Sequence, residues 1–186
     1  MNLDSILKLF ELAGYLKTLK RTGWVNSNIP APESVADHSY RTSLMALVLA
    51  SSVPNVDPTR AALMALIHDL SESVVGDITP FCPAELQIDK KAREIAAIQT
   101  MCQDLPKDVS TLIISLFREY EDNATPTAQF VKTIDKLEMV LQASEYEHKF
   151  DLPLPSFFSS VEVFMKDIHD PVLLEMFNLI KSKKKF

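Results

Sequence analysis

The segment Ile67-His68-Asp69-Leu70-Ser71-Glu72 holds the side chains best suited to chemistry. An imidazole stands next to a carboxylate inside an apolar run, and a second carboxylate follows. On an α-helix, side chains three and four residues apart are neighbours, so this spacing predicts that Glu72 lies over both His68 and Asp69. Such a group would hold a metal ion with an acid/base group beside it.

Two distant residues, His38 and Asp135, are candidates to complete this site. His38 shares a helical face with apolar residues and therefore points inward, and Asp135 lies at the edge of an apolar stripe. Two neutral imidazoles and two carboxylates suit Mn²⁺, Co²⁺, Fe²⁺, Ni²⁺ or Zn²⁺ and leave positions for water and a phosphate oxygen. Each residue alone has an ordinary explanation, because an inward histidine is often a core residue and Asp135 could pair with Lys132 or Lys136.

Composition favours a single all-α domain over residues 1–186. The chain has 186 residues, 47% of them hydrophobic, and only three glycines, which is typical of a helical protein with one core. We expect the metal and substrate core at about 3–147 and C-terminal helices at about 156–181. A net charge of −6 without a basic stripe argues against nucleic-acid binding. Short apolar runs argue against a membrane segment, and two cysteines outside a CxxC pattern favour the cytoplasm.

Apolar periodicity and capping residues place the elements that must position these side chains. Asp57 and Pro58 are typical of a helix start, and Gly76 of a helix end. The expected helices are Leu3–Leu19, Glu33 or Asp37 to Val53, Pro58–Val75, Ala84–Cys102, Lys107–Tyr120, Thr127–Glu147 and one or two beyond Pro155. The segments 20–32 and 77–83 are expected to be loops, and 181–186 a frayed tail.

Several motifs, in their order, resemble the HD-domain 5′-deoxynucleotidase family. They are Arg21-Thr22-Gly23-Trp24, Glu33-Ser34-Val35-Ala36-Asp37-His38-Ser39, His68-Asp69-Leu70-Ser71-Glu72, Val75-Gly76-Asp77-Ile78-Thr79-Pro80 and Asp135-Lys136-Leu137-Glu138. The resemblance extends to about Tyr146. It implies an all-α HD fold, commonly dimeric, that hydrolyses deoxynucleoside 5′-monophosphates to deoxynucleoside and phosphate.

The resemblance also implies roles for individual residues. The metal ligands would be His38, His68, Asp69 and Asp135, with Glu72 as general acid/base and Arg21 orienting the phosphate. The sugar pocket would involve Trp24, Asp77, Ile78, Thr79 and Pro80, and either Glu119 or Glu121. Trp24 fits a core position equally well.

Two other functions are compatible with this pattern. One is an HD phosphohydrolase acting on another phosphate ester or a cyclic nucleotide. The other is a catalytically silent HD protein that uses its helices to bind partners, although such a protein would be free to lose Glu72, which this sequence retains.

Overall fold

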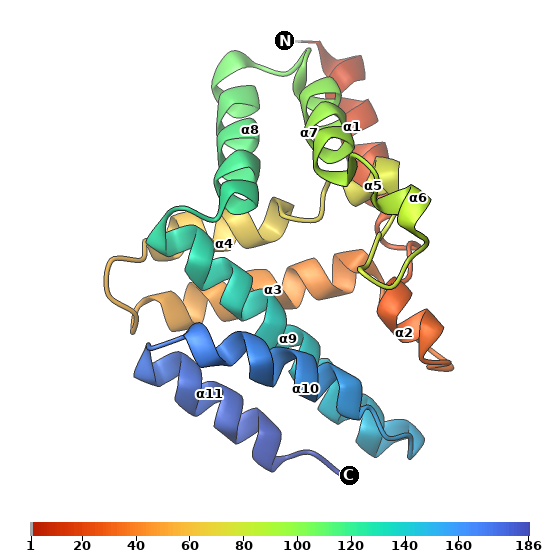
Figure 1. Ribbon diagram of the computed structural model, residues 1–186. Helices are drawn as coiled ribbons and strands as arrows, with labels where there is room; N and C mark the ends of the chain where they lie inside the picture. Colours follow the sequence, from red (N-terminus) through yellow and green to blue (C-terminus); the bar gives the residue numbers. More distant parts are fainter. Residues whose placement is uncertain (1) are drawn as a thin grey trace.

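The computed structural model describes residues 2–186, and α-helices dominate it (Figure 1). The helices are α1 (Leu3–Tyr15), α2 (Thr22–Asn26), α3 (Val35–Ala50), α4 (Pro58–Ile67), α5 (Glu72–Val75), α6 (Ala84–Gln87), α7 (Lys90–Cys102), α8 (Lys107–Asp122), α9 (Pro126–Phe150), α10 (Pro155–Phe164) and α11 (Pro171–Ser182), with a 3₁₀ turn, η1 (Met165–Asp167), after α10. The described residues contain no β-strand, and one isolated antiparallel bridge joins Lys20 and Ser34. The expected all-α fold is confirmed.

The long helix α9 is the centre of the molecule. It packs against α3, α4 and α8 and also against α10 and α11, which lie along it near the C-terminus (Figure 1). Its buried face combines apolar residues such as Ile134 and Leu137 with buried acids. A second apolar cluster forms where α1 meets α7 and α8. Asp135 is carried on the central helix, so its position is fixed by packing on several sides.

Capping residues explain where the helices around the site begin. Ser34 and Asp37 form a reciprocal capping box at the start of α3, and Asp57 caps α4 with Pro58 at its first position. Thr125 and Pro126 start α9 in the same way. The predicted helix start at Asp57 is confirmed, and the observed bounds of α3, α8 and α9 differ from the expected ones by at most a turn.

The prediction of one helix from Pro58 to Val75 was wrong. The chain leaves α4 after Ile67 and forms a tight turn before α5 begins at Glu72. In this turn the N–H groups of Leu70 and Glu72 bond to carbonyls three residues back, those of Ile67 and Asp69. Glu72 is therefore near His68 and Asp69 because of the turn, and not because they share a helical face.

Three further expectations also failed. The first helix ends at Tyr15, where the chain turns. The Leu19 carbonyl then accepts the N–H of Val35, the first residue of α3, and the Arg21 N–H donates to the Glu33 carbonyl. The expected loop 20–32 contains α2, which Asp77 anchors by accepting the Thr22 N–H. The segment 84–102 is split into α6 and α7 at Asp89, whose φ of 53° is left-handed.

The C-terminal tail is held against α9 and is not frayed. Glu147 is completely buried, and its carboxylate accepts the backbone N–H groups of Leu154 (2.9 Å) and Lys185 (3.0 Å). Ser144 donates to the Lys183 carbonyl at 3.0 Å. A buried carboxylate that binds backbone donors gives the tail a fixed path.

No helix within residues 2–186 is both long and apolar enough to cross a membrane.

Candidate active site

Three separate segments bring the four expected ligands together. His38 comes from α3, His68 and Asp69 from the turn after α4, and Asp135 from α9. Nε2 of His38 lies 3.2 Å from Asp135 Oδ1 and 3.7 Å from Asp69 Oδ2, which in turn lies 3.1 Å from His68 Nε2. Atoms of His38, His68 and Asp69 are close enough to share one metal ion. The convergence is the one expected from the sequence.

The two histidines present buried nitrogens without hydrogen bonds. Nδ1 of His68 lies 2.7 Å from the Ala65 carbonyl, and Nδ1 of His38 contacts Glu138. Within residues 2–186, both Nε2 atoms are buried and have no hydrogen-bond partner. Because buried polar atoms are normally satisfied, two unsatisfied nitrogens facing two carboxylates fit a metal ion.

The surrounding charges keep the two acids ionised. Burial by itself would raise the pKa of Asp69 and of Asp135. At Asp69 the charges of His68, Arg21 and His38 together outweigh burial, and at Asp135 those of Lys136, His38 and His68 do so together. Each pKa therefore lies well below its usual range. Both side chains are therefore available as anionic ligands near neutral pH.

Two opposing effects determine the pKa of His38. Burial and the positive charge of Arg21 disfavour its protonation, but Glu138 and Asp135 outweigh them and raise its pKa to about 10. Any cation that binds Nε2 must therefore displace a proton.

Glu72 is a buried acid whose pKa is affected by the charges of Asp69 and Asp77. Its side chain is buried, and Oε2 lacks a hydrogen-bond partner within the described residues. Burial, followed by the charges of Asp69 and Asp77, raises its pKa well above the usual value. A raised pKa favours a carboxyl group that can both carry and release a proton, as a general acid/base must.

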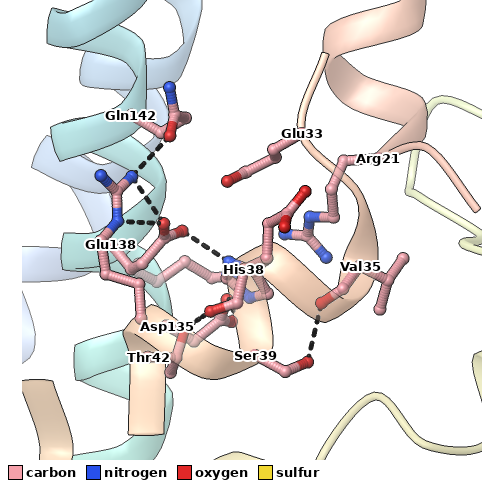
Figure 2. Close-up of polar contacts among 12 residues, drawn as sticks. Arg21, Glu33, Val35, His38, Ser39, Thr42, Asp135, Glu138 and Gln142 are labelled. Carbon is pink, nitrogen blue, oxygen red and sulfur yellow. Dashed lines mark hydrogen bonds and ion pairs between the residues drawn. The ribbon is translucent and has the colours of Figure 1, made fainter. Parts of the chain in front are cut away.

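Arg21 precedes α2 and reaches the same centre (Figure 2). Nη1 lies 3.2 Å from Asp69 Oδ2 and 3.9 Å from Asp77 Oδ1, and the side chain is only 16% exposed. Asp77 also accepts the Thr22 N–H, while its carbonyl accepts the Thr22 hydroxyl at 2.7 Å. Asp77 therefore fixes the start of α2, from which Arg21 projects.

The residues after Asp77 differ in their exposure. Ile78 is buried, Thr79 is half-buried and Pro80 is exposed. The backbone N–H and the hydroxyl of Thr79 both lie close to the Cys82 sulfur. Direct contact of all three with one substrate remains a prediction.

Trp24 lies in the hydrophobic core. It is 2% exposed, stacks on Phe157 with ring centroids 4.2 Å apart and meets the Tyr146 ring edge-on at 5.2 Å. Its Nε1–H donates to Glu33 Oε1 at 2.8 Å. Since Glu33 has an oxygen close to His38 and Glu138, Trp24 reaches the site through Glu33.

Of the two acids proposed near the sugar, Glu119 is already engaged. Arg60 donates to one of its oxygens and the Thr125 hydroxyl to the other. Between Glu119 and Glu121, this favours Glu121. The remaining two histidines, His148 and His169, are both exposed.

Sequence patterns assigned no role to Glu138, Arg41 or Tyr120, although each lies in or beside the site. Glu138 bonds to His38 and Arg41, and the Tyr120 hydroxyl lies 3.5 Å from Asp135 Oδ2. The available signal was the spacing of Glu138, three residues after Asp135 within an apolar stripe. A charged residue there is seldom buried unless it is paired.

An all-helical fold with ligands in the order His, His-Asp and Asp defines the class of HD domains, and the family model described as HD domain matches residues 13–172. The human protein named 5′-deoxynucleotidase HDDC2 is 44% identical over 145 residues, which cover 77% of this chain and 69% of the human one. The Dictyostelium discoideum protein of the same name is 38% identical over 98% of this chain and all of its own. A solved structure from Pyrococcus horikoshii OT3 has 31% identity and a TM-score of 0.79, covering 96% of this chain and 99% of that one. The chain belongs to the HD-domain 5′-deoxynucleotidase family.

Proposed function

We propose that the protein is a metal-dependent phosphomonoesterase that hydrolyses deoxyribonucleoside 5′-monophosphates to deoxynucleoside and phosphate. The observation that carries this proposal is the pair of buried, unpartnered Nε2 atoms of His38 and His68, which face two ionised carboxylates. The relatives named 5′-deoxynucleotidase point to the same reaction.

The metal would be held by His38, His68, Asp69 and Asp135. A set of two imidazoles and two carboxylates suits Mn²⁺, Co²⁺, Fe²⁺, Ni²⁺ or Zn²⁺, since none of these requires a purely oxygen or sulfur environment. When bound, such an ion acidifies water and neutralises phosphate charge. The protein then has to supply only ligands, an acid/base and a cation.

Glu72 would handle the proton of the reaction. Its unpartnered Oε2 accepts a proton from the attacking water and returns one to the leaving 5′ oxygen. Burial, followed by the charges of Asp69 and Asp77, raises its pKa, which favours a carboxyl group that can both bind and release a proton.

Arg21 would bind the phosphate. Its guanidinium carries donors in a planar fork that matches two phosphate oxygens. Asp69 and Asp77 hold the guanidinium beside the ligand cluster before substrate arrives, which lowers the ordering cost of binding.

The segment from Asp77 to Pro80 would face the sugar, with Glu121 approaching from α8. A carboxylate near the 2′ position disfavours binding of a ribose substrate, whose additional hydroxyl must be desolvated. The same carboxylate can accept a hydrogen bond from the 3′ hydroxyl, which both sugars have. This gives Asp77 a part in deoxyribose preference in addition to its bond to Thr22. The kinetics of Asp77→Asn on dAMP and AMP test this role. Unchanged discrimination between the two substrates would mean that Asp77 acts only through its contact with Thr22.

Partners and location follow from the same reasoning. We propose a small-molecule substrate, no nucleic-acid or membrane partner, a homodimer and a cytoplasmic location. The net charge of −6 and the two free cysteines, Cys82 and Cys102, support these proposals.

The decisive experiment measures phosphate release from dAMP, dTMP, dCMP, dGMP and AMP by protein stripped of metal and reloaded with Mn²⁺ or Co²⁺. Metal-dependent release that favours the deoxy substrates and disappears in Glu72→Ala supports the proposal. Release only from another phosphate ester or a cyclic nucleotide would assign a different HD phosphohydrolase. No release from any of them by folded, metal-loaded protein would indicate the silent binding protein.

A further inference from the structure

Glu138 is a completely buried carboxylate beside the ligands, and the mechanism above leaves it without a role. It lies on α9, three residues after Asp135, and its side chain is 0% exposed. Oε2 contacts His38 Nδ1 at hydrogen-bonding distance, and Oε1 accepts the Arg41 Nε–H at 2.8 Å (Figure 2). Both oxygens therefore have partners, so Glu138 is poorly placed to be a ligand itself.

Arg41 holds this carboxylate in place. It lies on α3, three residues after His38, and its Nη2 approaches Glu138 Oε1 at 2.7 Å. The same guanidinium donates to Gln142 and to Glu145, each at 2.7 Å. Arg41 thus joins the helix that carries His38 to the helix that carries Asp135.

The contact with Glu138 determines which nitrogen of His38 is free. A neutral imidazole has one N–H and one lone pair. A carboxylate at Nδ1 requires the hydrogen there, which leaves the lone pair on Nε2, the atom that faces Asp69 and Asp135. The same contact prevents rotation of the ring away from the centre.

We propose that Glu138, held by Arg41, is a positioning residue that fixes the tautomer and orientation of His38 and thereby sets the affinity of the centre for its metal. Histidine ligands that donate to a carboxylate lose about 10- to 100-fold in metal affinity when that carboxylate is removed. The inference rests on the proposed metal centre and adds two residues, Glu138 and Arg41, to those that control it.

A purely structural role is the alternative, because a buried ion pair between α3 and α9 also affects folding. Removing one member strands a buried charge, which is strongly destabilising, whereas replacing both with apolar groups is often tolerated. The double variant Arg41→Met/Glu138→Met therefore separates the two roles. It lacks the partner of His38 but leaves no unpaired charge.

The test compares wild type, Glu138→Gln, the double variant and Glu145→Gln. An amide has one acceptor oxygen and cannot serve both His38 and Arg41 as the carboxylate does. Glu145 contacts the same guanidinium but is 49% exposed, which makes Glu145→Gln the matched control. Affinities for Mn²⁺ and Zn²⁺ are measured by competition with a chelator, alongside the Tm of each metal-free protein and the ¹⁵N shifts of the His38 ring in the Zn²⁺ form.

We expect metal affinity to fall about 10- to 100-fold in Glu138→Gln and in the double variant, with a changed His38 ring signal, while Glu145→Gln behaves as wild type. Wild-type affinity in folded Glu138→Gln would overturn the inference. So would recovery of affinity in the double variant, because the loss would then come from the stranded Arg41 charge. A wild-type protein that binds neither metal would instead overturn the proposed function.

Discussion

Replacing Trp24 with phenylalanine decides whether this residue serves the core or the substrate. The change keeps an aromatic ring against Phe157 but removes the Nε1–H that donates to Glu33 at 2.8 Å. A hydrogen bond to a charged group contributes about 1.5–3 kcal/mol, and the smaller ring leaves a cavity that costs on the order of 1 kcal/mol more. We therefore expect the free energy of unfolding to fall by about 2–4 kcal/mol, a large part of the ~5–15 kcal/mol typical of a domain.

The assay is urea unfolding followed by far-UV circular dichroism, since Trp24 is the only tryptophan and the variant lacks its fluorescence. The kcat and KM for dAMP are measured on the same preparations. Phe157→Leu is the matched control, because it disturbs the same stacked pair from α10 without removing the donor to Glu33. A core role predicts that both variants lose stability while KM stays near the wild-type value. An unchanged free energy of unfolding with a tenfold higher KM, equivalent to about 1.4 kcal/mol of binding, would refute this reasoning.

Three other perturbations test the site. Glu72→Gln should lower kcat by about 10²- to 10⁴-fold while retaining metal, because it removes the acid/base alone; an unaltered kcat would assign the proton transfer elsewhere. Burial and the charge of Glu138 raise the pKa of Glu33 to about 7, so the native state of the metal-free protein binds a proton that the unfolded state has released. The contribution of Glu33 to stability is then largest below pH 4.5 and is lost as pH rises to 7, and Glu33→Gln should gain up to about 3 kcal/mol at pH 8. Thermal unfolding of both proteins from pH 4.5 to 8 measures this, and equal pH slopes would contradict it. Finally, chelation should abolish phosphate release, because the proposed reaction needs the metal. The raised pKa of His38 means that a metal ion must displace a proton, so metal affinity should increase with pH between 6 and 8. A pH-independent affinity would contradict the assignment of His38 as a ligand.

The buried positions of several candidate ligands could be predicted because they depend on patterns of neighbouring residues. The positions of His38 and Asp135 on buried faces follow from apolar periodicity, which the structure retains in α3 and α9. The start of α4 follows from Asp57 and Pro58, whose effects are confined to one turn. Features that depend only on residues close in the chain can be predicted from a single sequence.

The break between α4 and α5 could not be predicted for the opposite reason. No glycine or proline interrupts residues 59–75, so periodicity continues across the break. The turn is accompanied by contacts that the sequence does not display, such as Asp69 with Arg21, 48 residues away. The same limit applies to Glu138, whose partners His38 and Arg41 lie about a hundred residues away. Tertiary contacts overrode helix propensity in the first case and supplied the missing charge partner in the second.

The charge balance of the centre explains why the proposed substrate and metal belong to one site. The ionised Asp69 and Asp135 line the centre, and Asp77 is near. Arg21 pairs with Asp69 and Asp77, and Lys136 pairs with Asp135. A phosphate dianion entering the centre would meet these carboxylates at close range, and their partners Arg21 and Lys136 are already engaged in ion pairs. A divalent cation held by the same acids would offset their charge, which would leave Arg21 available to the phosphate. The proposed metal would thus belong to the phosphate-binding site itself, together with Arg21.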